Sequence, residues 1–119
     1  MKPVTSSALM LLLIISSIFS GCSKASSNNA VNPSTCAGTA YSFSADVKPI
    51  FTTSCAISGC HDAASTNSGG PFTTYALIHA KASTIEGQVN AGLMPQSGSI
   101  TADQKKKIIC WVESGAPNN

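Results

Sequence analysis

The chain has 119 residues, enough for one domain; only 10% of them are charged, and the formal net charge is +2. No arginine occurs, and the one basic run, the lysines at 105–107, is either the solvated face of a helix or a docking point for an acidic partner. Nucleic-acid binding depends on arginine forks and basic stripes, so this composition argues against such partners.

The first 21 residues have the features of an export signal. Lys2 precedes an apolar run over residues 8–19 that is broken only by two serines. This run is shorter than the roughly 20 apolar residues that a membrane-spanning helix needs. We therefore expect residues 1–21 to be a signal peptide that is removed on export.

Ser20 and Gly21 stand immediately before Cys22 and resemble the lipidation motif of bacterial lipoproteins. The resemblance implies that Cys22 becomes an acylated amino terminus, and two or more acyl chains anchor a protein stably in a membrane. Ser23 stands where an aspartate would signal retention in the inner membrane, which favours an outer-membrane anchor facing the periplasm. The alternative is an ordinary secretory signal that leaves Cys22 as a free thiol.

Two parts follow the signal peptide. Residues 22–40 are rich in serine, asparagine, alanine and threonine, which predicts a flexible tether between the lipid and the folded domain. Residues 41–119 contain several helical patterns, described below in chain order. We expect them to form one all-α domain of three to four short helices.

The first helix is expected to have Asp46 as its N-cap and Pro49 in its first turn, where a missing amide proton costs little. Its apolar face is formed by Val47, Ile50 and Phe51. The helix leads directly into Cys55 and so fixes this thiol on a rigid element.

Residues 55–61 combine two thiols and an imidazole in the pattern C-x4-C-H. A cysteine pair followed by histidine is the chemistry that attaches haem covalently, because each thiol adds to a vinyl group and the histidine ligates the iron. The usual spacing is C-x2-C-H, so the loop between Cys55 and Cys60 must bow outward, and Gly59 supplies backbone freedom for it. The alternative is a disulfide between the two cysteines, with His61 on the polar surface.

A second helix is expected to start after Thr73 as its cap and to run to about Ala82. Phe72 and Leu77 are placed to pack against each other across its start. The helix carries His79, a rival iron ligand, although a helical histidine beside a lysine is more often half-exposed. A zinc site is disfavoured because the C-x4-C-H segment supplies only three ligands.

Residues 83–91 fit a short helix or an extended strand, since Ile85 and Val89 can line either one. Met94 follows in an irregular loop, where Pro95 restricts its backbone. A thioether is a soft ligand that suits haem iron opposite histidine and raises its reduction potential. Met94 is therefore a candidate distal ligand; the alternative is that it fills a gap in the core.

The last helix is the clearest element of the chain. Thr101 and Gln104 form a capping box, residues 105–112 form the helical body, and Gly115 ends it. Its apolar face is formed by Ile108, Trp111 and Val112. Residues 117–119 are expected to fray.

Four cysteines remain after Cys22, and an exported chain usually commits an even set of thiols in an oxidising compartment. If haem takes the two cysteines of the C-x4-C-H segment, Cys36 and Cys110 remain as a disulfide pair that ties the start of the domain to its last helix. Two disulfides would satisfy the count equally well.

Four signatures along the chain together resemble the small c-type cytochrome domain of bacterial exported proteins. They are DVKPIF at 46–51, C-x4-C-H at 55–61, Met94-Pro95 and WVESGA at 111–116. The resemblance implies a small cytochrome c-like fold around one covalent haem c. It makes Cys55 and Cys60 the thioether attachments. His61 becomes the proximal ligand and Met94 the distal ligand.

The expected function is periplasmic electron transfer by a monomeric, monohaem c-type cytochrome that exchanges electrons with redox partner proteins. Six-coordinate iron leaves no position for a substrate, so we do not expect an enzyme. If Met94 were not bound to the iron, the open position would suit ligand sensing or weak peroxidase activity. The alternative from another class is a haem-free, disulfide-stapled lipoprotein that serves as a binding or structural module.

Overall fold

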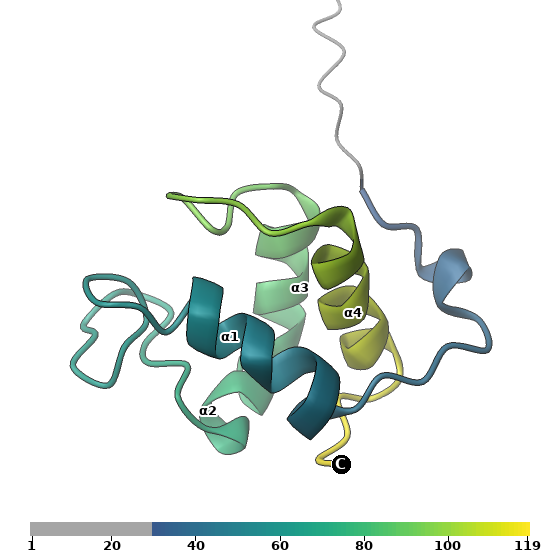
Figure 1. The fold of residues 1–119 in the computed structure, drawn as a ribbon, viewed down its shortest axis with the longest axis horizontal. Coiled ribbons are helices and arrows are strands. Elements are labelled where there is room, and N and C mark those ends of the chain that lie inside the picture. The colour runs from purple at the N-terminus through teal and green to yellow at the C-terminus, as the bar shows by residue number, and fades with distance from the viewer. Residues whose placement is uncertain (1–29) are drawn as a thin grey trace, which may run out of the picture.

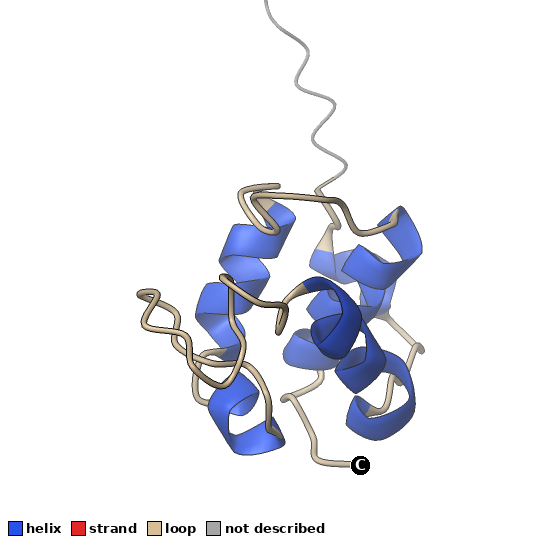
Figure 2. Ribbon diagram, turned by 60° about the vertical axis from the view of Figure 1, so that its left-hand side comes forward, coloured by secondary structure: helices blue, strands red, loops and turns tan. Residues whose placement is uncertain are grey.

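Four α-helices make up most of the ordered structure in residues 30–119, the part of the chain that the computed structural model describes (Figure 1). In chain order the elements are the 3₁₀ turn η1 (Pro33–Cys36), the π-turn η2 (Phe43–Val47), α1 (Lys48–Ser54), α2 (Tyr75–His79), α3 (Ala82–Asn90) and α4 (Ala102–Glu113). No strand occurs in this range, which confirms the all-α prediction (Figure 2). The expected signal peptide and Cys22 lie outside the described residues.

The first helical stretch begins at Phe43, earlier than predicted, and Ser42 is its N-cap. The Ser42 hydroxyl accepts a hydrogen bond from the Ala45 amide (3.1 Å), and the Asp46 carboxylate accepts one from the Ser42 amide (3.0 Å). The prediction of Asp46 as the N-cap was therefore wrong. The N-cap is Ser42, and Asp46 accepts the hydrogen bond that the backbone amide of Ser42 donates. A π-turn precedes Pro49, and this wider turn accommodates a residue that has no amide proton to donate.

Helix α2 is shorter than predicted and starts one residue later. Thr74, not Thr73, caps it by accepting a hydrogen bond from the Leu77 amide at 3.4 Å. Leu77 is 39% exposed, whereas Phe72 is buried, so the predicted packing of these two residues across the helix start is wrong. Phe72 packs instead on a histidine described below.

The ambiguous segment over residues 83–91 forms helix α3, and no strand is present in it. Ile85 and Val89 are both buried on one side of this helix, at the i, i+4 spacing. Helix α3 packs against α4. Asn90 at its end exchanges two hydrogen bonds with the backbone of Val31, so the segment before η1 is held against the domain.

Helix α4 has the capping box that the sequence predicts. The Thr101 hydroxyl accepts from the Gln104 amide (3.1 Å), and the Gln104 side chain accepts from the Thr101 amide (2.8 Å). At the other end the Ala116 amide donates to the Trp111 carbonyl at 2.9 Å, a bond that satisfies a carbonyl left open by the end of the helix.

The last residues of the chain do not fray, contrary to expectation. The Trp111 indole N–H donates to the Pro117 carbonyl at 2.9 Å, and the Tyr75 hydroxyl donates to the Ala116 carbonyl at 2.9 Å. The Asn119 side chain and backbone carbonyl accept from the amides of Phe43 and Ser44, both at 2.8 Å. These bonds satisfy free donors of the first helical turn, which no local sequence pattern reveals.

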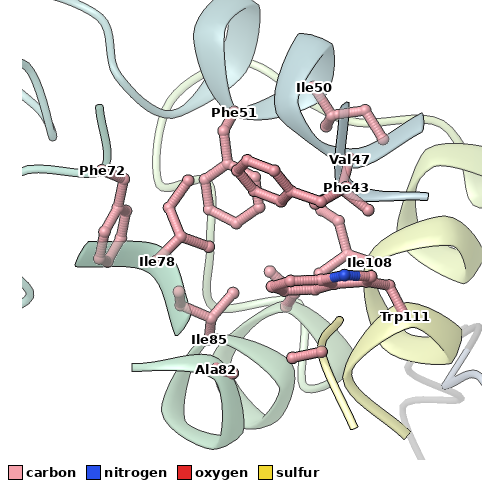
Figure 3. Close-up of a cluster of buried hydrophobic side chains, with 12 residues drawn as sticks. Phe43, Val47, Ile50, Phe51, Phe72, Ile78, Ala82, Ile85, Ile108 and Trp111 are labelled. Atoms are coloured by element: carbon pink, nitrogen blue, oxygen red, sulfur yellow. The ribbon is translucent and has the colours of Figure 1, made fainter. Parts of the chain in front are cut away.

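Trp111 lies at the centre of the hydrophobic core (Figure 3). Its ring is fully buried and contacts the ring of Phe43 at a centroid distance of 5.6 Å. Phe43 and Tyr75 meet edge to face at 5.1 Å, and Phe51 and Phe72 do the same at 5.8 Å. The aromatic side chains therefore join the first helical stretch, α2 and α4 into one core.

A disulfide joins Cys36 in η1 to Cys110 in α4, with a Cα–Cα distance of 5.1 Å. This confirms the predicted pairing of these two residues. Cys110 is fully buried beside Ile109, and neither belongs to the core cluster that contains Ile108 and Trp111, so the bond holds η1 on a second buried part of α4.

The lysine run at the start of α4 is not merely a solvated face. Lys105 donates to the Asn90 carbonyl at 2.8 Å, at the carboxyl end of α3. Lys107 lies 3.5 Å from both Asp46 and Asp103, and these carboxylates raise its pKa. Two of the three lysines therefore join elements of the fold.

No helix within residues 30–119 is long and apolar enough to cross a bilayer.

Two carboxyl groups meet where α3 packs on α4 and make stability depend on pH. Burial and then the neighbouring Glu113 raise the pKa of Glu86 to about 7. Between pH 4.5 and 7 the folded state keeps a proton that the unfolded state has lost, so stability should fall as pH rises through this window. We expect Glu86→Gln to remove this dependence and to stabilise the protein at pH 8 by about 1 kcal/mol, allowing for solvent screening.

Urea unfolding of both proteins at pH 5 and pH 8 measures this effect. Glu113→Gln is the matched variant, because it removes the same repulsion from the opposite helix. An unchanged difference between the two pH values in Glu86→Gln would contradict the assignment.

Candidate cofactor-binding site

A cavity of about 810 Å³ brings together all four residues that the sequence predicts as haem attachments or ligands. Cys55, Cys60, His61 and Met94 all line it. Its walls come from the end of α1, from one face of α3 and from two loops, the one between α1 and α2 and the one between α3 and α4. Both loops extend to the left-hand side of the helices in Figure 1. The volume falls in the range of roughly 300–1,000 Å³ that is typical of ligand and cofactor pockets. His79 does not line the cavity and is exposed.

Cys55 and Cys60 are free thiols, whereas Cys36 and Cys110 form a disulfide. The disulfide loop that the haem-free alternative requires is therefore not formed. Burial, and to a smaller extent the neighbouring Cys60, raise the pKa of Cys55 to about 11. Cys55 consequently stays a neutral S–H group at physiological pH, and the cavity presents two thiols that are not committed to each other.

The bowed loop between the two thiols is closed by backbone hydrogen bonds. The His61 amide donates to the Cys55 carbonyl at 3.0 Å, and the Cys60 amide donates to the Ile57 carbonyl at 3.0 Å. Gly59 has a φ of +80°, a left-handed conformation that other residues rarely adopt. The loop thus accommodates the wider C-x4-C spacing, and both cysteines still line one cavity.

His61 presents one ring nitrogen for coordination. Its Nδ1 donates to the Gly70 carbonyl at 2.7 Å, because a carbonyl oxygen can only accept. Nε2 therefore carries the lone pair and is the atom available to a metal, the tautomer that metal-bound histidines commonly have. The side chain is 9% exposed, so its orientation is determined by the surrounding protein.

Two neighbours restrict the His61 ring, one stacked on a ring face and one close to its Cε1 atom. The Phe72 ring stacks on it at a centroid distance of 4.2 Å and an interplanar angle of 27°. Gly69 approaches so closely that a Cβ at this position would lie 2.8 Å from the imidazole Cε1 and 3.2 Å from Cζ of Phe72. Gly69 and Gly70 were not among the predicted site residues, because their contacts with His61 leave no local pattern in the sequence.

Replacing Gly69 by alanine should displace the His61 ring. The added methyl group cannot fit unless the imidazole or the Phe72 ring moves, and overpacking of this kind typically costs 1–3 kcal/mol. We expect a corresponding loss in the free energy of unfolding and a changed ¹⁵N shift of the His61 ring. The control is Ser68→Ala, since Ser68 is exposed; equal effects in both variants would contradict the close contact.

The loop that carries these groups is tied back to the cysteine motif. The Ser65 hydroxyl and the Asn67 amide group both donate to the Cys60 carbonyl, the second at 2.6 Å. The Phe72 amide donates to the His61 carbonyl at 2.9 Å. These bonds make residues 60–72 a defined support for the imidazole.

Met94 lies in the loop after α3 and is half-buried. The amides of Leu93 and Met94 both donate to the Gln88 carbonyl, at 2.9 and 3.2 Å. The Met94 side chain packs against the hydrophobic core, and Met94 borders the same cavity as the C-x4-C-H segment.

The remaining lining residues decide what chemistry the cavity accepts. Its apolar walls are Phe51, Phe72, Ile85 and Val89. Within residues 30–119 no three His, Cys, Asp or Glu side chains are grouped so as to hold a metal ion. Comparisons with protein-family models, curated proteins and solved structures found no match to this chain.

Proposed function

We propose that this protein is a monohaem c-type cytochrome that transfers electrons in the periplasm. The observation that carries the proposal is a single cavity lined by two free thiols, a histidine with an available Nε2 and a thioether. These are the donor types that covalent haem attachment and His/Met ligation require. Haem, when bound, supplies reversible one-electron chemistry at its iron.

The residues of the cavity fit a flat, largely apolar ligand. Phe51, Phe72, Ile85 and Val89 form apolar walls, and no acidic side chain lines the cavity. The thiols of Cys55 and Cys60 would each add across one vinyl group. Each sulfur would bond to one vinyl carbon and its thiol proton would go to the other, so the addition would need no oxidant.

His61 and Met94 would be the protein ligands of the haem iron. The hydrogen bond from Nδ1 to the Gly70 carbonyl fixes the ring and increases the basicity of Nε2. Two protein ligands leave no position for a substrate, so we propose electron carriage and not catalysis. The protein would act as a monomer, and it would exchange electrons with redox partner proteins.

The proposed location is a membrane surface in an exported compartment. Residues 1–21 would act as the signal peptide, and Cys22 would be the lipid anchor in the outer membrane, facing the periplasm. The Cys36–Cys110 disulfide supports an oxidising compartment. Residues 22–40 would tether the domain to the lipid.

A pyridine haemochrome spectrum tests the proposal. The protein is exported to a periplasm that contains cytochrome c maturation machinery, and a denaturing gel is stained for peroxidase activity. We expect a c-type spectrum that survives denaturation in the wild type and in Ser58→Ala, a control within the same loop. Cys55→Ser/Cys60→Ser should lose the covalent band.

A colourless wild-type protein would overturn the proposal, provided that a known cytochrome matures in the same cells. Four oxidised thiols in that product would support the haem-free, disulfide-stapled module instead. Haem that is removed by denaturation would show binding without the thioether bonds.

A further inference from the structure

Helix α3 presents a divided face to the cavity. Five of its residues, counting the N-cap, line the cavity, and they are Lys81, Thr84, Ile85, Gln88 and Val89. At 100° per residue, the three polar positions fall within one 60° sector and the two apolar positions occupy the adjoining sector. The helix therefore offers an apolar strip bordered by a polar edge.

Lys81 is the one charged residue among those lining the cavity. Within residues 30–119 it has no acidic partner, whereas Lys107 is paired with two carboxylates and Lys105 binds the end of α3. Thr84 and Gln88 add hydroxyl and amide donors along the same edge. Such an edge suits an acidic group of a ligand whose body lies on the apolar strip.

We infer that Lys81, Thr84 and Gln88 form the subsite that binds the carboxylate groups of the ligand. This inference rests on the proposed function, in which those groups are the two haem propionates. The vinyl and propionate groups occupy opposite edges of the porphyrin. The segment that carries the thiols therefore cannot supply the carboxylate subsite, and α3, which borders the same cavity and carries its one charged side chain, can.

The subsite would also affect the reduction potential. A cation beside the propionates favours the reduced iron, which carries one positive charge less, and it holds the propionates ionised to lower pH. Removing the charge of Lys81 should lower the potential, and it should move the pH-dependent step of the potential to higher pH.

Redox titration of the haem-loaded protein across pH 4 to 9 tests the inference. The variants are Lys81→Gln, the conservative Lys81→Arg, and Lys106→Gln, which removes the same charge from a lysine outside the cavity. We expect a lower potential and a displaced pH step in Lys81→Gln alone, with both restored in Lys81→Arg.

Haem content, measured on the same samples, distinguishes failure of the proposed function from failure of the subsite alone. A wild type without haem would overturn the proposed function and the subsite with it. A loaded wild type whose potential and pH step are the same in Lys81→Gln and Lys106→Gln would overturn the subsite alone.

Discussion

Replacing Cys36 and Cys110 by alanine should lower the free energy of unfolding by about 4 kcal/mol. The disulfide joins residues 74 apart in sequence, so it removes much of the conformational freedom of the unfolded chain, and the chain-entropy model gives about 4 kcal/mol for a loop of this size. Domains of this length have net stabilities of only about 5–15 kcal/mol. The double variant should therefore be close to unfolding at moderate temperature.

Urea denaturation of the wild type and the double variant measures this loss. Reduction of the wild type provides the matched control, because it opens the same bond without changing the sequence. The reduced protein and the variant should have similar midpoints. A loss below about 1 kcal/mol in both would mean that the bond does not restrict the unfolded chain as the entropy model requires.

The expectations that agree with the structure rest on three different kinds of argument. The capping box of Thr101 and Gln104 needs only three residues of spacing, and α4 forms as predicted. The pairing of Cys36 with Cys110 followed from assigning the other two thiols to haem, and the structure has the same pair. The convergence of Met94 on the C-x4-C-H segment was expected from the family resemblance, and both line one cavity.

The features that were missed depend on contacts between distant parts of the chain or on unusual backbone. Asn119 completes the first helical turn from 75 or more residues away. Gly69 is defined by its approach to the His61 ring, and a glycine in a polar loop carries no sign of such a contact. The π-turn before Pro49 breaks the 3.6-residue period, so the helix start was placed too late.

Replacing Met94 by alanine should have the largest effect on the proposed electron-transfer function. The thioether would be the distal ligand, and methionine opposite histidine raises the potential of haem iron. We expect the potential to fall by on the order of 0.2 V, within the roughly 0.8 V range that axial ligands set. The sulfur-to-iron absorption band should disappear, and cyanide should bind rapidly at the vacated position.

Leu93→Ala is the matched control for this experiment. Leu93 precedes Met94 in the same loop, and 59% of it is exposed. Its amide hydrogen bond to the Gln88 carbonyl is a backbone interaction that the substitution retains. The control should therefore keep the absorption band and the wild-type potential. If Met94→Ala also kept both, Met94 would be a core residue and the distal position would belong to another group or be open.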